Sequence, residues 1–265
     1  MSAITTMDGV VAGLAGGTFC SIQKASMTVA TGAIYAMWRT TGFPIQPAIP
    51  GTTAAVCDDT IAGAFVLPAV SPLYFLRASI VSTVPAHWMF YDRIMHVGGL
   101  SGTVTTAQTV GVNLTSAVSQ SRCLSTGADV EWYLECYTAL GATTTTATIT
   151  YTNQAGTTGQ TTSVTIPATW PASQCLRILP STGYIQSVQS VTLAASTLTA
   201  GSFGVTARKR ITALPQLLAN VGVIADAIAL GAPLITQYHC IEILMLPTTT
   251  SSGIILADFK VGAPA

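Results

Sequence analysis

Residues 145–166 read TTATITYTNQAGTTGQTTSVTI, and this stretch decides the fold class. Apolar residues alternate with threonine before the Asn-Gln-Ala-Gly segment, as at Ala147, Ile149 and Tyr151, and again after it, up to Ile166. A period of two puts the apolar side chains on one face of a strand, and a glycine-containing segment between two such runs indicates a β-hairpin. The outward face is a ladder of threonines, which favour strands without adding charge.

The strand signal continues on both sides of this hairpin. At residues 130–137, Trp132 and Leu134 fall on one face, while Tyr133 and Glu135 fall on the other. Further runs of strand character occupy residues 26–31, 33–39, 73–80, 88–91, 175–179, 188–194, 203–211, 240–246 and 254–261. Short strands separated by Gly, Ser, Thr and Pro turns are typical of an all-β fold. We expect an antiparallel β-sandwich or a jelly-roll-like β-barrel, with at most one or two short helices.

Three segments depart from this pattern. Residues 1–22 are expected to form an N-terminal arm or a short helix, followed by a β-sandwich domain over residues 23–265, undivided or in two sub-domains that meet near residues 100–125. Residues 43–51 carry three prolines, which exclude regular helix and central strand and predict an ordered loop. Apolar residues recur at helical spacing in residues 215–233, which favours a buried helix over a long apolar loop.

The composition is poor in charge. Only 8% of the 265 residues are charged, 49% are hydrophobic, and the formal net charge is +0. Interface cores are depleted of charge, so this composition favours an assembly subunit over the alternative of an ordinary secreted β-protein. Zero net charge argues against a nucleic-acid partner. The apolar stretches fall short of the ~20 uninterrupted residues of a membrane span, and the first residues lack the basic flank of a secretory signal, so no membrane partner is expected.

Six cysteines are scattered along the chain without a Cys-x-x-Cys pair. They are Cys20, Cys57, Cys123, Cys136, Cys175 and Cys240. Structural zinc sites need closely spaced ligands, so no metal is expected. Buried free thiols are the default for a protein assembled in a bacterial cytosol, although six cysteines also allow fifteen disulfide pairings.

Few titratable residues gather in one part of the sequence. The densest group is His87, Asp92, Arg93 and His96, which has the residue types of an acid–base or metal site. We favour a structural role, in which Asp92-Arg93 follows the apolar strand 88–91 and a buried or half-buried ion pair holds a turn there.

Other charged positions are also interpreted as structural. Glu131 and Glu135 would lie roughly 13 Å apart along one strand, farther than the carboxylates of a glycosidase. Asp58-Asp59 is expected to be a solvated loop, and Arg208-Lys209-Arg210 a solvated strand end that divides between two faces. The sequence predicts no catalytic, cofactor-binding or metal-binding residue, no cofactor, and a protein that is not an enzyme.

Three stretches carry a resemblance to a known group of proteins. They are residues 91–96 with 98–109, residues 130–159 (VEWYLECYTALGATTTTATITYTNQAGTTG) and residues 186–211 (QSVQSVTLAASTLTAGSFGVTARKRI). These resemble Thr/Ala-rich virion structural proteins of tailed bacteriophages of Gram-negative bacteria, over about half the chain. The resemblance implies a component of the phage particle, assembled in the host bacterial cytoplasm, and brings no catalytic residues with it.

Within that group the fold and composition fit a capsid decoration, or cement, protein. Such a protein would bind the major capsid protein or other virion proteins and itself, as a homo-oligomer for which we expect a trimer. A tail, collar or baseplate component is the alternative with the same composition. A carbohydrate-binding β-sandwich module is another alternative, since Trp132, Tyr133, Tyr137 and Trp170 are candidate exposed aromatics.

Overall fold

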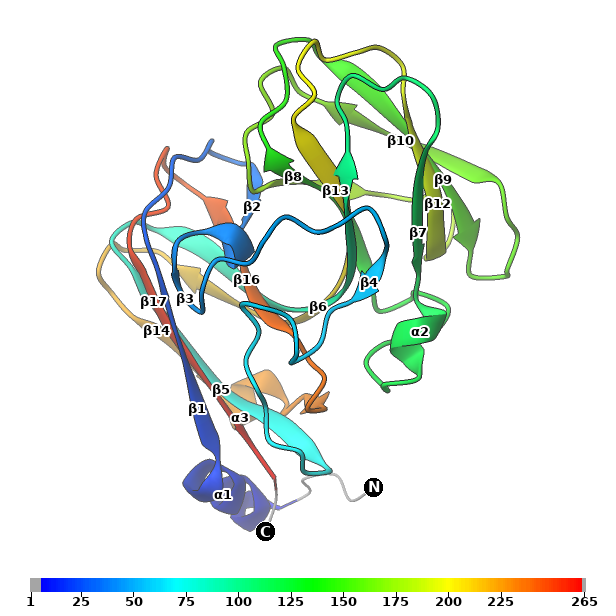
Figure 1. Ribbon diagram of the computed structural model, residues 1–265. Coiled ribbons are helices and arrows are strands. Elements are labelled where there is room, and N and C mark those ends of the chain that lie inside the picture. The colour runs from blue at the N-terminus through cyan, green and yellow to red at the C-terminus, as the bar shows by residue number, and fades with distance from the viewer. Residues whose placement is uncertain (1–5, 264–265) are drawn as a thin grey trace.

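The computed structural model describes residues 6–263, and a closed β-barrel stands at its centre (Figure 1). Six antiparallel strands follow one another in the order β13-β8-β11-β2-β16-β6, and a further pairing between β13 and β6 closes the ring. The barrel strands are β2 (Ile34–Ala36), β6 (Ala86–Leu100), β8 (Glu131–Thr138), β11 (Gln174–Ile178), β13 (Ser202–Gln216) and β16 (Ile241–Pro247). The short strand β4 (Ala55–Val56) pairs with β6 at Met95 and His96, beyond the part of β6 that pairs with β16.

Two further sheets flank the barrel on opposite sides (Figure 1). The six-stranded sheet has the order β14-β5-β17-β1-β3, with β15 also paired to β5, and the four-stranded sheet has the order β10-β9-β12-β7. The six-stranded sheet consists of β1 (Thr18–Lys24), β3 (Gly42–Phe43), β5 (Leu73–Ser82), β14 (Val223–Asp226), β15 (Leu234–Ile235) and β17 (Ile255–Gly262). The four-stranded sheet consists of β7 (Gln108–Asn113), β9 (Thr145–Asn153), β10 (Gln160–Ile166) and β12 (Ile185–Leu193).

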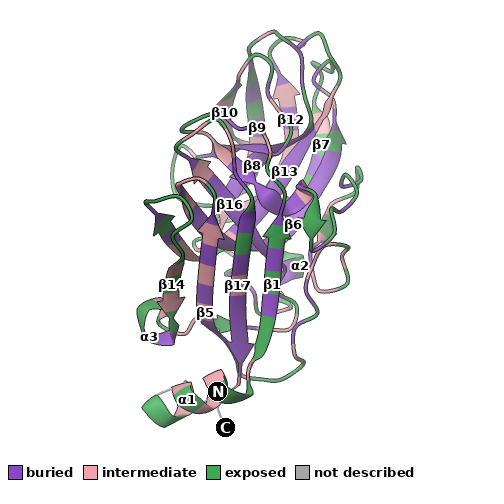
Figure 2. Ribbon diagram, turned by 90° about the vertical axis from the view of Figure 1, so that its left-hand side faces the viewer, coloured by how far each residue is buried: buried purple, intermediate pink, exposed green. Residues whose placement is uncertain are grey.

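Helical structure is sparse and short. The described residues form α1 (Met7–Gly16), α2 (Thr115–Val118), α3 (Ala227–Leu230) and the 3-10 turn η1 (Met37–Arg39). Helix α1 begins where the Thr6 hydroxyl accepts a hydrogen bond from the Gly9 amide at 3.2 Å, and it lies at the foot of the six-stranded sheet (Figure 2). None of these helices has the length and apolar character needed to span a bilayer.

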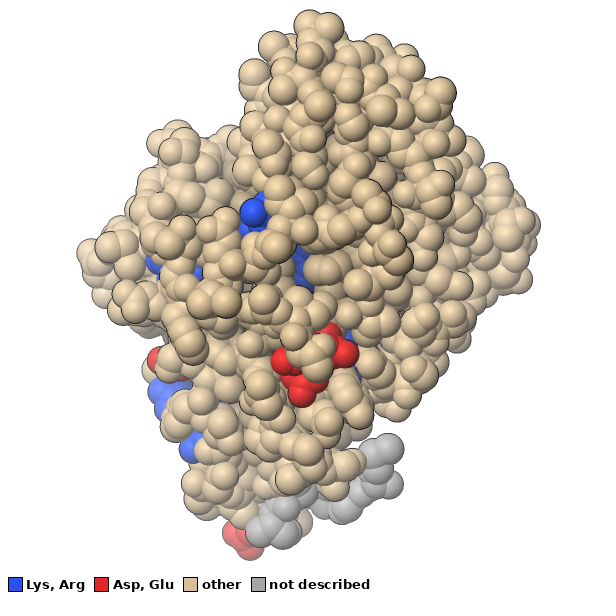
Figure 3. Space-filling model, viewed as in Figure 1, with Lys and Arg blue, Asp and Glu red and all other residues tan. Residues whose placement is uncertain are grey.

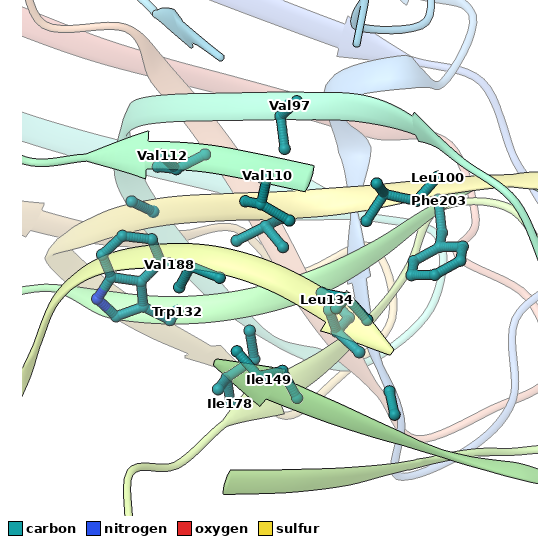
Figure 4. Close-up of a cluster of buried hydrophobic side chains, with 14 of the residues drawn as sticks. Val97, Leu100, Val110, Val112, Trp132, Leu134, Ile149, Ile178, Val188 and Phe203 are labelled. Carbon is teal, nitrogen blue, oxygen red and sulfur yellow. The ribbon is translucent and has the colours of Figure 1, made fainter. Parts of the chain in front are cut away.

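The flanking sheets pack on the barrel through two separate apolar cores. Trp132, Leu134 and Phe203 point outward from the barrel toward Ile149 and Val188 of the four-stranded sheet (Figure 4). The core on the side of the six-stranded sheet includes Phe75, Trp88, Phe90, Ile243 and Phe259. Successive residues of a strand point to opposite faces, so each barrel strand contributes to an outer core and to the barrel interior.

The all-β fold is confirmed, and so is the hairpin at residues 145–166. Strands β9 and β10 pair antiparallel with Thr145 opposite Ile166 and Tyr151 opposite Gln160. Most of the other predicted strands occur within a few residues of their expected positions. Residues 26–31 form only an isolated bridge at Thr28, and the strand predicted for residues 33–39 covers only Ile34–Ala36, because Met37–Arg39 form a 3-10 turn. Residues 6–263 contain three short α-helices, one more than expected.

The helix predicted for residues 215–233 is wrong. Strand β13 runs on to Gln216, and the chain then turns through Asn220 at φ 59° into β14, which pairs with β5. The backbone hydrogen bonds of this segment are satisfied by the edge of a sheet, and only α3 is helical. The apolar residues at helical spacing remain on the outside of the molecule.

The prediction that the strand 88–91 ends at Asp92 is also wrong, because β6 continues to Leu100. Asp92 and Arg93 are both fully buried in the middle of this strand. A charged dipeptide usually marks solvent, but here each side chain meets an opposite charge from another part of the chain. Those partners make it possible for the strand to continue through the interior.

Candidate functional site

The interior of the barrel holds a quartet of charged side chains, one from each of four strands. Arg93 of β6 lies 2.9 Å from the carboxylate of Glu135 on β8 and 3.2 Å from that of Glu242 on β16. Arg208 of β13 lies 2.6 Å from Glu135 and 2.5 Å from Glu242. Each charge therefore has two neighbours of opposite sign, and all four side chains are at most 1% exposed.

The quartet holds its members in their charged forms. Burial by itself would raise the pKa of Glu135, but Arg93 and Arg208 lower it to about 2. Burial would likewise lower the pKa of Arg93, whereas Glu135 and Glu242 raise it above its ordinary value. Removal of one member would leave a buried charge without compensation, which is far more costly than loss of an exposed pair.

Aromatic and polar side chains enclose the quartet. The guanidinium of Arg93 lies 5.4 Å from the ring centre of Trp38, and that of Arg208 lies 5.2 Å from the ring centre of Tyr133. Arg93 also donates to the Nδ1 atom of His96 at 3.1 Å. Burial, followed by the charge of Arg93, lowers the pKa of His96 to about 3, so this imidazole is neutral and can accept that bond.

A second buried ion pair joins Asp92 to Arg122, which follows helix α2. The Arg122 guanidinium also donates to the carbonyl of Arg93 at 2.8 Å, and Asp92 accepts the amide hydrogen of Cys240 at 2.8 Å. His239 lies 3.7 Å from Asp92, and burial lowers the pKa of its imidazole. This cluster ties the connection between β7 and β8 to the wall of the barrel.

Asp92 and Arg93 take part in buried ion pairs, as expected, but the predicted turn is wrong because both residues lie within β6. The two residues are adjacent on β6, where successive side chains diverge, and each pairs with a different partner. Of the four residues in that sequence cluster, Arg93 and His96 come together, while His87 lies far along the strand opposite Leu246. Within residues 6–263, no three His, Cys, Asp or Glu side chains gather as a metal site would require.

The structure also tests the predictions for the cysteines, for residues 208–210 and for the loop at Asp58-Asp59. All six cysteines are free and buried, as expected, and burial raises the pKa of each thiol, to about 11 for Cys20. The predicted solvated strand end at residues 208–210 is wrong, because β13 runs on to Gln216 and Arg208 is buried; only Arg210 is exposed, and Lys209 is partly exposed. The Asp58 carboxylate accepts the amide and hydroxyl hydrogens of Thr60, within a partly exposed loop.

The aromatic residues considered for carbohydrate binding are not exposed. Trp132, Tyr133, Tyr137 and Trp170 are all buried, with at most 4% of their surface accessible. Trp132 packs between the barrel and the four-stranded sheet, and its indole donates to the carbonyl of Ile185 at 3.1 Å. The premise for a sugar platform at these four positions is therefore wrong.

Two charged members of the buried clusters, Glu242 and Arg122, were not identified from the sequence. Glu242 lies in Ile-Glu-Ile-Leu-Met-Leu, residues 241–246, where a single carboxylate sits among apolar residues on both strand faces. That context is a usable signal of a buried, partnered charge. Arg122 lies in a polar segment, and no local pattern distinguishes it from a solvated arginine.

The outer surface is poorer in charge than the composition alone indicates, because eight of the 20 charged side chains are buried. Figure 3 shows one face on which charged groups are few and separated by wide uncharged areas. Large apolar side chains are exposed on several elements. The most exposed are Leu217 (81%), Val66 (79%), Leu198 (76%), Ile228 (67%) and Leu218 (65%).

Comparison with known proteins gives little guidance. No family model matches the chain, and no curated protein matches it. Among solved structures, the chain is similar to the VP2 subviral particle of infectious bursal disease virus, at 10% identity and a TM-score of 0.19, over 94% of this chain and 81% of that chain. The structure of the Gt strain of the same virus gives 9% identity and a TM-score of 0.19, over 94% and 82%. Scores this low do not establish a shared fold.

Proposed function

We propose that the protein is a structural subunit of a phage particle, and specifically a capsid decoration protein. One observation carries the proposal. Eight of the 20 charged side chains are buried, so the outer surface consists mainly of hydroxyl and apolar side chains. A surface with few charges to desolvate is suited to permanent contact with other subunits.

The most exposed apolar segment lies beside a sheet edge. Five apolar side chains of this segment are each more than half exposed, and we call them the apolar ridge: Leu217, Leu218, Val221, Ile224 and Ile228. Strand β14, within the ridge, is the last strand of its sheet and pairs only with β5. Exposed apolar side chains beside an open strand edge are characteristic of a contact surface and are a liability in an isolated monomer.

The resemblance to Thr/Ala-rich virion proteins of tailed phages supports a place in the particle. We propose that the protein binds the major capsid protein or other virion proteins. We also propose that it binds further copies of itself and forms a homotrimer. A tail, collar or baseplate component remains the alternative. Zero net charge speaks against a direct nucleic-acid partner.

We also propose that the protein is not an enzyme. The buried carboxylates Glu135 and Glu242 are each held by two arginines, and Asp92 is held by Arg122. A general acid or base must reach its substrate, and these groups are committed to internal partners.

Quantitative mass spectrometry of purified particles tests the assignment. A decoration protein is expected at hundreds of copies per virion, in a fixed ratio to the major capsid protein. A dozen copies or fewer would reassign the protein to the tail, collar or baseplate, and absence from the particle would refute the virion role. Multi-angle light scattering of the purified protein tests the trimer separately.

A further inference from the structure

A groove of about 470 Å³ opens on the barrel wall, where several strands begin or end. It is formed by the start of β8, the end of β11, the start of β12 and the middle of β13. Its volume falls in the range of small-molecule sites. The side chains that matter for its chemistry are Asp129, Glu131, Arg177, Tyr184, Lys209 and Arg210.

Accessible positive charge is concentrated in this groove. Of the ten Lys and Arg side chains, five are not buried, and three of those five line the groove. The two outside it are Arg39, which donates to the carbonyls of Pro47 and Tyr137, and Arg77 on the other side of the barrel. A protein with so little surface charge has thus placed most of its accessible cations in one hollow.

The three cations differ in how far they are occupied by internal partners. Lys209 lies 2.9 Å from Asp129 and donates to the carbonyl of Arg122 at 3.1 Å. Arg177 has a side chain 47% exposed and lies 3.5 Å from Glu131. The side chain of Arg210 is exposed and, within residues 6–263, makes no hydrogen bond or ion pair, while its backbone pairs with β6 opposite Tyr91. Two guanidinium groups therefore keep donors available for an anion, and a guanidinium matches a carboxylate in a bidentate manner.

The groove also offers acceptors and an aromatic wall. Glu131 is fixed by hydrogen bonds from the hydroxyls of Tyr91 at 2.8 Å and Tyr133 at 2.6 Å, so its position is set before any ligand arrives. Tyr184, which also lines the groove, is 49% exposed. Carboxylates that accept from hydroxyl groups, together with a half-exposed ring, are the usual means of binding a sugar ring.

We propose that this groove binds an acidic saccharide. Arg210 and Arg177 receive the sugar carboxylate, Glu131 accepts from the sugar hydroxyls, and Tyr184 packs against the ring. Asp129 and Glu131 would repel the closely spaced phosphates of a nucleic acid, which leaves a single carboxylate on a polyhydroxy ring as the better match. The proposal does not depend on the virion role, because the groove and the apolar ridge share no residue.

Isothermal titration of the full chain with D-glucuronate, with D-glucose and with inorganic phosphate tests the proposal. We expect saturable millimolar binding of glucuronate, weakened at least tenfold in Arg210→Gln and Arg177→Gln and reduced by added salt. Glucose, which lacks the carboxylate, should bind at least tenfold more weakly. Tyr184→Ala should weaken glucuronate without changing any response to phosphate. Arg77→Gln is the matched control and should bind as the wild type does.

Each other result contradicts the proposal. No saturable binding of glucuronate to the wild type would overturn it, and so would equal binding of glucose. Phosphate binding as tight as that of glucuronate, unaffected by Tyr184→Ala, would identify a simple anion site and overturn the saccharide assignment. Thermal melting of each variant shows whether it is folded, and an unfolded Arg210→Gln would leave Tyr184→Ala and the comparison between ligands to decide.

Discussion

Replacing Glu135 by glutamine removes one charge from the centre of the barrel while keeping the size of the side chain. In the wild type this carboxylate accepts from Arg93 at 2.9 Å, from Arg208 at 2.6 Å and from the Thr206 hydroxyl at 2.8 Å. In the variant the two arginines share the single carboxylate of Glu242, so the barrel interior holds an excess positive charge.

Two routes give the expected magnitude. Loss of one partner from a buried ion pair costs about 3–5 kcal/mol in the free energy of unfolding. The pKa of Glu135 is lowered from 4.5 to about 2, which at 1.36 kcal/mol per pKa unit corresponds to about 3 kcal/mol. At about 2–4 °C for each kcal/mol in a domain of this size, the melting temperature should fall by about 6–20 °C.

The pH dependence follows from the direction of the shift. Because the folded pKa of Glu135 is lowered, its carboxylate stabilises the fold above the unfolded pKa of 4.5, and this contribution is lost as the pH falls through about 2. The deficit of Glu135→Gln relative to the wild type should therefore be full near pH 7 and should shrink from about pH 5 downward.

Denaturant unfolding followed by tryptophan fluorescence at several pH values measures both effects. Asp129→Asn is the matched control, because Asp129 pairs with Lys209 at the surface, where the side chains are 26% and 33% exposed. Its loss should cost no more than about 1 kcal/mol. A loss for Glu135→Gln no larger than that of the control, or a deficit that does not change with pH, would refute the reasoning.

Three further predictions concern the thiols, the barrel seam and the apolar ridge. In the native protein none of the six buried thiols should react quickly with an aromatic disulfide reagent, and all six should react after unfolding. A mass of the native protein that is lower by two hydrogens would indicate a disulfide bond and contradict this prediction. Gly204→Ala should lower the free energy of unfolding by at least about 2 kcal/mol, because the added Cβ would lie 1.8 Å from the Val97 carbonyl oxygen, where β13 pairs with β6. Chemical unfolding measures this loss. Gly51→Ala is the control: its added Cβ meets open space, so its free energy of unfolding should be nearly unchanged. The double variant Leu217→Ser, Leu218→Ser should change the unfolding free energy by no more than about 0.5 kcal/mol, while light scattering shows weaker self-association; unchanged association would remove the ridge as a contact.

The sequence predicts side-chain faces well, because alternation is a local property. Along β8 it separates Trp132 and Leu134 from Tyr133 and Glu135, and the structure keeps that division. What it could not show is that both faces are buried. A face that carries Glu and Tyr looks solvent-exposed in sequence, and it becomes interior only when arginines from β6 and β13 arrive to pair with Glu135.

The errors share the same origin. The β6 strand passes through Asp92 and Arg93 because their partners come from Arg122 and from strands β8 and β16, all distant in sequence. The helical spacing of apolar residues in 215–233 predicts a helix, but this spacing alone does not distinguish a buried helix from exposed apolar residues beside a sheet edge. Neither the closure of the barrel nor the groove has a local signature, since both are formed by segments far apart in the chain.

The distribution of charge gives the molecule two kinds of surface. Twelve charged side chains remain outside the interior, and five of these line the groove. The other seven are spread over the rest of the molecule. Two are the basic residues Arg39 and Arg77, and five are acidic: Asp8, Asp58, Asp59, Asp226 and Asp258. A partner that recognises shape and apolar contact can therefore approach almost anywhere without desolvating charge, whereas an anion finds a local excess of accessible cations only in the groove. Assembly and recognition of a charged ligand would thus use separate parts of the same small barrel protein, and variants of the ridge and of the groove should affect one without the other.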